Sequence, residues 1–133
     1  MIYEKRLLIP NLTLESAPVS TTVEIHPGIV KQVQVYFPPG VAALAHIQIF
    51  YWERQFWPTN PNSSFTGDNT LLSFPEDLVI TDPPFEFEIK GWNNDDTYPH
   101  TPIIRFQMQA EKLTAVDLLK LLTLGPAGPQ TPA

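Results

Sequence analysis

The chain contains no cysteine, which excludes disulfide bonds and metal sites built on thiolates. Basic residues are also scarce, with 8 Lys and Arg against 14 Asp and Glu and a net charge of −6. Nucleic-acid binding needs clustered basic side chains, so we expect no nucleic-acid partner. No apolar run has the length of a bilayer span, and the N-terminus lacks the sustained apolar stretch of a signal peptide. We therefore expect no membrane partner and no signal peptide.

Glycine is sparse and proline is abundant, with 6 and 15 residues respectively. Proline stops helices and is excluded from central positions of a sheet, and here it falls mainly between apolar runs. Several runs alternate with period two; Ile104, Phe106 and Met108, for example, alternate with Arg105 and Gln107. The pattern predicts strands over residues 3–9, 19–25, 29–37, 44–52, 70–74, 78–80, 85–92 and 102–109.

A length of 133 residues suits one domain. Short strands separated by turn residues predict an all-β fold, a single antiparallel β-sandwich that is jelly-roll-like with about eight strands. The sequence divides into a sandwich domain over 1–110, a short C-terminal α-helix over 111–124 and a flexible Pro/Gly tail over 125–133.

The C-terminal segment has a different period from the strands. Thr114 and Asp117 resemble a capping box, and Gly125-Pro126 is a helix stop. The apolar side chains between them exceed a single stripe, so more than one side of the helix needs burial. We expect it to fold over its own sheet or to dock on a neighbouring subunit, through Val116, Leu118, Leu119, Leu121, Leu122 and Leu124.

Residues 53–70 are predicted to form a long polar loop with Phe56, Trp57 and Phe65 as aromatic anchors. Loops of this length in compact domains are often functional or bound to a partner. These three aromatic residues and the C-terminal apolar residues are our interface candidates.

A second polar loop follows Gly91 and supplies our candidates for ligand binding. Its Asn and Asp residues could offer oxygen ligands to Ca²⁺, but the spaced pattern of a calcium loop is missing. Asn and Asp also suit turns, because they bond to their own backbone and tolerate the left-handed conformation. The candidates are Trp92, Asn93, Asp95, Asp96, Tyr98 and His100.

Aromatic residues flank both long loops. Trp57, Trp92 and Tyr98, beside Asn and Asp, could stack on a sugar ring as in carbohydrate-binding sandwiches. The competing interpretation is that large rings pin the loops to the end of the sandwich.

The sequence shows no convincing catalytic set. A cupin-like metal site would need a His-x-His pair, and here the nearest match is His46-Ile47-Gln48 followed by Glu53 and His100. The Gly-x-Ser-x-Gly elbow and both common Gly-rich phosphate motifs are absent from the sequence. We expect a non-enzymatic protein with no catalytic residues, no metal and no cofactor.

Three stretches carry a resemblance to a known group: HPGIVKQVQVYFPPGVAALAHIQIF, WPTNPNSSFTGDN and GWNNDDTYPHTPIIRF. Together they span roughly Thr22 to Phe106, and they resemble small proteins encoded in tailed-phage and related viral genomes. The resemblance implies a virion component, such as a head decoration or an accessory structural protein, located in the virion or in the host cytoplasm during assembly. It transfers no functional residue.

The leading hypothesis from the sequence is a structural protein that acts through protein–protein contacts. Its partner would be another protein or a second copy, in a homo-oligomer or a capsid-like scaffold. The alternative is a carbohydrate-binding sandwich that uses the loop aromatics.

Overall fold

A computed structural model describes residues 1–110 of the chain. The predicted C-terminal helix (111–124) and tail (125–133) lie outside the described residues. So do the interface candidates Val116, Leu118, Leu119, Leu121, Leu122 and Leu124.

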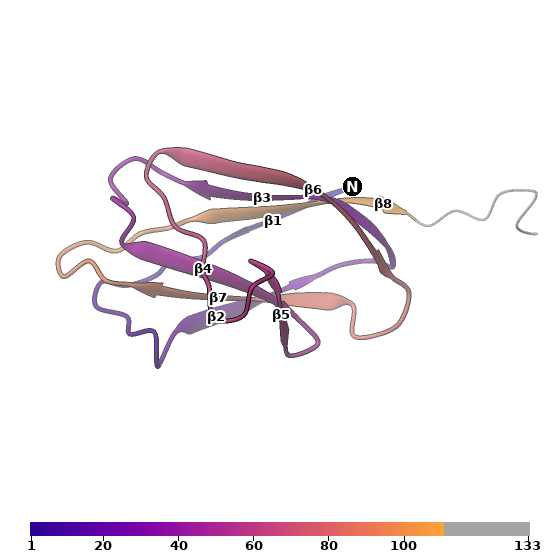
Figure 1. Ribbon diagram of the computed structural model, residues 1–133, viewed down its shortest axis with the longest axis horizontal. Coiled ribbons are helices and arrows are strands. Elements are labelled where there is room, and N and C mark those ends of the chain that lie inside the picture. The colour runs from indigo at the N-terminus through magenta and orange to yellow at the C-terminus, as the bar shows by residue number, and fades with distance from the viewer. Residues whose placement is uncertain (111–133) are drawn as a thin grey trace, which may run out of the picture.

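Residues 1–110 form an all-β structure of two antiparallel four-stranded sheets, which are the two layers seen in Figure 1. One sheet has the order β1-β8-β3-β6 and the other has the order β2-β7-β4-β5. The strands are β1 (Ile2–Arg6), β2 (Val19–Glu24), β3 (Gly28–Phe37), β4 (Ala45–Tyr51), β5 (Arg54–Trp57), β6 (Thr70–Ile80), β7 (Glu86–Asn93) and β8 (Ile103–Ala110).

The predicted alternation of apolar residues is confirmed in the central strands. In β8, Ile104, Phe106 and Met108 point into the core, because every second residue of a strand faces the same side. The two sheets meet through stacked rings: the Phe87 and Phe106 centroids lie 4.5 Å apart. Trp57 packs edge-on against Phe87 at 5.5 Å.

The prediction of one long loop over 53–70 is wrong at its start, because β5 occupies Arg54–Trp57. The chain reverses through Trp52 and Glu53, whose φ angles are 53° and 63°. Positive φ at both central residues is the geometry of a tight hairpin turn, which usually recruits Asn and Gly. With Trp and Glu at those positions, the usual sequence signal of the turn is missing.

Two short strands were predicted where the structure has one. β6 runs unbroken from Thr70 to Ile80 and includes Pro75. Among residues 1–110 this strand lies at the edge of its sheet and pairs only with β3. Pro75 therefore removes no hydrogen bond to a second neighbouring strand in this part of the chain.

The two ends of the sandwich carry different loops. The β1–β2 connection (7–18), the β3–β4 connection (38–44) and the β7–β8 connection (94–102) gather at one end, on the left of Figure 1. The β4–β5 turn and the β6–β7 connection lie toward the other end, where Met1 and Ala110 are also found.

Candidate functional site

Two loops at one end of the sandwich are joined by backbone pairing. Ile9 and His100 exchange both backbone hydrogen bonds, at 2.8 and 3.0 Å, in an isolated antiparallel bridge. A second bridge joins Thr13 to Asn93. The 7–18 and 94–102 connections therefore behave as one layer across this end of the fold.

Asn93 is the buried centre of that layer, with 0% exposure. Its side-chain amide donates to the carbonyl of Ile9 at 3.2 Å and to the carbonyl of Tyr98 at 3.0 Å. Its Oδ1 accepts the backbone N–H of Asp95 at 2.9 Å. Buried polar groups need partners, and the Asn93 side chain meets this need inside the protein.

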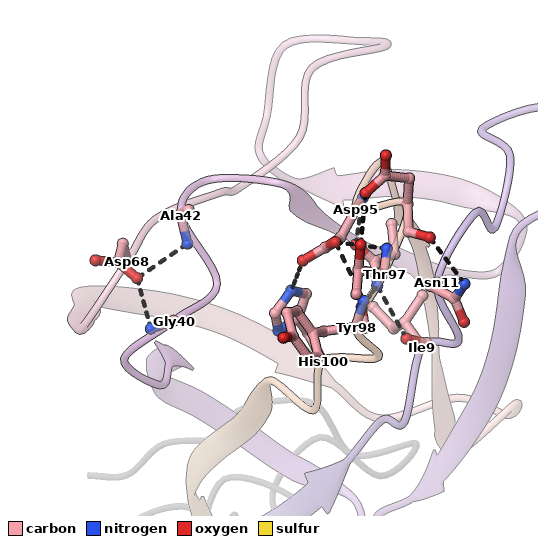
Figure 2. A network of polar contacts seen from close by, with 11 residues as sticks. Ile9, Asn11, Gly40, Ala42, Asp68, Asp95, Thr97, Tyr98 and His100 are labelled. Carbon is pink, nitrogen blue, oxygen red and sulfur yellow. Dashed lines mark hydrogen bonds and ion pairs between the residues drawn. The ribbon is translucent and has the colours of Figure 1, made fainter.

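The Asp95 carboxylate forms hydrogen bonds within its own loop, the β7–β8 connection, as Figure 2 shows. Its Oδ1 accepts the backbone N–H groups of Thr97 at 2.8 Å and Tyr98 at 3.1 Å, and its Oδ2 lies 2.8 Å from Nε2 of His100. The Thr97 hydrogen bond, followed by those of His100 and Tyr98, lowers the pKa of the Asp95 carboxyl below its ordinary value. A carboxylate held in this way fixes a turn.

Asp68 has a similar role in the neighbouring loop. One carboxylate oxygen accepts the backbone N–H groups of Gly40 and Ala42, each at 2.9 Å (Figure 2). The short β3–β4 connection is therefore also held in one conformation.

The structure brings the predicted ligand candidates of the second loop together, but it uses their polar atoms internally. Asn93, Asp95 and His100 bond to one another or to nearby backbone, and Asp96 Oδ1 accepts the hydroxyl of Thr97 at 2.8 Å. Within residues 1–110, no group of three His, Asp or Glu side chains is arranged to hold a metal ion. The geometry is that of a loop scaffold.

The three residues that came nearest to a cupin-like metal site, His46, Glu53 and His100, lie far apart in the structure. His46 lies on the outer face of β4, where its ring stacks on Trp92 with centroids 5.0 Å apart and planes 6° from parallel. Glu53 lies in the turn beyond the far end of β4, about 20 Å away at the usual rise per residue. His100 is bound to Asp95 in the loop layer.

His46 contacts two loops from the outer face of its sheet. Its Nδ1 lies 2.9 Å from the Ser64 hydroxyl, and its Nε2 lies 3.4 Å from Nδ2 of Asn94. Burial lowers the pKa of the His46 imidazole, and the charge of Glu15 opposes this in part. A neutral ring that donates from Nδ1 and accepts at Nε2 satisfies both contacts.

Trp57 and Trp92 are both buried and present little ring surface to solvent. Trp57 is 2% exposed and donates its indole N–H to Glu76 Oε2 at 2.8 Å, while Trp92 is 5% exposed beneath the His46 stack. The assignment of Trp57 to an interface and of Trp92 to ligand binding stays a prediction, and both rings are buried within residues 1–110. Of the three aromatic residues assigned to sugar binding, Tyr98 is exposed.

Phe56 and Phe65 are half-buried, not free interface residues. Phe56 meets Tyr51 edge-on at 5.6 Å, and Phe65 packs on Phe74 at 5.5 Å. These rings anchor the 58–69 segment to the core, which agrees with the anchoring interpretation for this loop.

The sequence did not predict that the two bridged loops, 7–18 and 94–102, expose large apolar side chains. Four large side chains of the two bridged loops are between 61% and 65% exposed. In the sequence they resemble core residues, since each stands beside or near buried apolar positions. We call this set the leucine patch: Leu8, Leu12, Leu14 and Tyr98.

No protein-family model matches the chain, and no curated protein is detectably similar to it. Within residues 1–110, no helix is long and apolar enough to cross a membrane.

Proposed function

We propose that this protein is a non-enzymatic structural component of a virion that works through protein–protein contacts. The strand orders β1-β8-β3-β6 and β2-β7-β4-β5 support a jelly roll, in which eight strands form two Greek keys. Viral capsid domains often use this architecture, although a fold alone does not define a function. The resemblance of residues 22–106 to small viral proteins points the same way.

The leucine patch is the observation that carries the proposal. Its two loops are fixed by the Ile9–His100 bridge and by Asn93, so the exposed apolar side chains sit on a preformed surface. Exposed apolar side chains that are held on a rigid frame favour a protein contact, because burying them removes apolar surface from water. Burying each of them in a contact would contribute up to about 1.5–3 kcal/mol.

Solution mass tests the contact directly. We expect wild-type protein to self-associate at high micromolar concentration and the triple variant Leu8→Ser/Leu12→Ser/Leu14→Ser to remain monomeric. The matched control is Leu71→Ser/Val79→Ser, which removes two exposed apolar side chains from edge strand β6. A monomeric wild type, or a triple variant that associates as wild type does, would contradict assembly through the patch.

The viral assignment has its own test. Capsid or tail genes adjacent to the gene for this chain would support a virion role, whereas a neighbourhood of metabolic genes would contradict it. The carbohydrate alternative predicts saturable binding on a glycan array that is lost in Tyr98→Ala, because the Tyr98 ring is exposed while Trp57 and Trp92 are buried.

A further inference from the structure

The end of the sandwich opposite the leucine patch presents an aromatic ring to solvent. Trp52 is at the tip of the β4–β5 hairpin and is 66% exposed. The neighbouring Tyr51 is fixed, because its hydroxyl donates to the carbonyl of Asp82 at 3.1 Å and its ring packs edge-on against Phe56 and Phe87. A firmly held hairpin therefore displays a freely accessible indole.

Two hollows adjoin this indole, and both are lined by Trp52 and Glu53. One has a volume of about 350 Å³ and lies along the hairpin itself. The other has a volume of about 300 Å³ and opens over the outer face of the β2-β7-β4 sheet. We call the second one the acidic hollow; its lining is Thr22, Phe50, Trp52, Glu53, Pro84, Glu86 and Glu88.

Three glutamates line the acidic hollow, and of these Glu88 lies near a lysine, Lys90. Glu86 stands directly across the strand pair from Glu24, an unfavourable arrangement of like charges. Among the residues that the structure describes, no Lys, Arg or His comes within 4.0 Å of the carboxylates of Glu24, Glu53 or Glu86.

The same face already contains one cation over an aromatic ring. Lys90 Nζ lies 4.6 Å from the centroid of Phe50 and 3.9 Å from Glu88. The Phe50 ring and the Glu88 carboxylate thus share an internal cation. Within residues 1–110, no cation lies over the Trp52 indole or against the carboxylates of Glu53 and Glu86. Trp is the best aromatic partner for a cation.

We propose that the acidic hollow binds an arginine side chain of a basic protein segment, with the guanidinium on the Trp52 indole and its N–H groups on Glu53 and Glu86. A planar guanidinium stacks on aromatic faces and pairs with carboxylates, whereas the ammonium of lysine is more strongly hydrated. The acidic lining excludes phosphates and other anions by like-charge repulsion. This site is separate from the leucine patch and gives the sandwich a second, charge-specific contact at its other end.

Peptide titration tests the proposal, with Ac-Gly-Arg-Gly-Arg-Gly-amide as the probe. The matched probes replace arginine by citrulline, which keeps the shape and removes the charge, or by lysine. Indole fluorescence is the readout, because Trp52 is exposed while Trp57 and Trp92 are buried. We expect saturable binding of the arginine peptide, weaker binding of the lysine peptide and none of the citrulline peptide.

Variants separate recognition from folding. Trp52→Asn is the sharpest, because asparagine tolerates the positive φ at this position, so the hairpin is preserved while the indole is lost. Calorimetry with the arginine peptide should then show binding weakened by about tenfold, the size of one well-formed cation–π contact. Glu86→Gln should weaken it similarly, and Tyr98→Ala at the opposite end should have no effect. Equal binding of the arginine and citrulline or lysine peptides, or wild-type affinity in Trp52→Asn, would overturn the assignment.

Discussion

Nε2 of His100 lies 2.8 Å from Oδ2 of Asp95, and both side chains are nearly buried, with exposed fractions of 10% and 11%. The backbone of the same histidine pairs with Ile9. One residue therefore connects the internal hydrogen bonds of the β7–β8 loop to the β1–β2 loop, which carries most of the leucine patch.

The Asp95 carboxyl makes stability dependent on acid pH. Its pKa is lower in the folded protein than the ordinary value of about 3.9 in an unfolded chain. The stabilisation is therefore fully present above about pH 4 and is lost as the pH falls through the lower, folded-state value. We expect Asp95→Asn to melt at a lower temperature at neutral pH and to show a shallower loss of stability in acid. Equal acid profiles for the variant and the wild type would contradict this role.

Removal of the Asn93 side chain should destabilise the whole loop layer. Asn93→Ala removes the side-chain donor to the Tyr98 carbonyl and the acceptor of the Asp95 N–H, while the Ile9 carbonyl keeps its bond from the His100 N–H; we expect a cost of about 1–3 kcal/mol in the free energy of unfolding. Urea unfolding measures the difference. The control is Asn11→Ala, which removes one exposed contact to the Asp96 carbonyl and should change little.

The hydrogen bond from Trp57 to Glu76 crosses from β5 to β6, and so joins the two sheets along one side. Trp57→Phe keeps an aromatic ring but loses the donor, and we expect a loss of about 1.5–3 kcal/mol, as for hydrogen bonds to charged groups. A double-mutant cycle with Glu76→Gln isolates the pair. Strictly additive effects of the two substitutions would show that the contact contributes nothing.

His46 should contribute stability that depends on pH near neutrality. Because burial lowers its pKa, the folded protein resists protonation that the unfolded chain accepts below about pH 6.5. Its contribution is thus complete above that pH and declines as the pH falls toward the folded-state value. NMR titration of the imidazole should give a midpoint below about 6.5, and His46→Gln should lose this part of the pH dependence. A midpoint at or above the ordinary value would refute the prediction.

The β4–β5 turn should tolerate substitution and gain stability from it. Trp52→Asn/Glu53→Gly places residues that favour positive φ at both central positions. The left-handed conformation costs other residues about 1–2 kcal/mol each, and this relief exceeds the entropy cost of the new glycine, so we expect a net gain in the free energy of unfolding. Thermal melting checks this against wild type. A loss of stability would mean that the Trp52 side chain supports the hairpin, in contrast to its exposed position.

The sequence predicts the strands of this fold well where one face is buried. Val33, Val35 and Phe37 alternate cleanly, and the structure buries all three. The failures have local causes: the turn at Trp52 lacks its usual residues, and the edge position of Pro75 cannot be read without knowing the strand order.

The candidate site was predicted only in part. The predicted loop over 91–101 begins too early, because Gly91, Trp92 and Asn93 end strand β7. The sequence also could not show that Asn93 is paired with Ile9, a residue 84 positions away. Whether a polar group is free to bind a ligand depends on such distant partners. The exposure of Leu8, Leu12 and Leu14 was unreadable for the same reason.

The strand order also determines when the domain can form during synthesis. Among residues 1–110, β4 and β5 are the only consecutive strands that pair, whereas β1 pairs only with β8 and β2 only with β7. β1 leaves the ribosome before the other seven strands of this sandwich and must wait for β8, since this neighbour ends at Ala110. Nascent chains shorter than this keep apolar strands unpaired, so this domain closes after translation of its final strand and depends on avoiding aggregation until then.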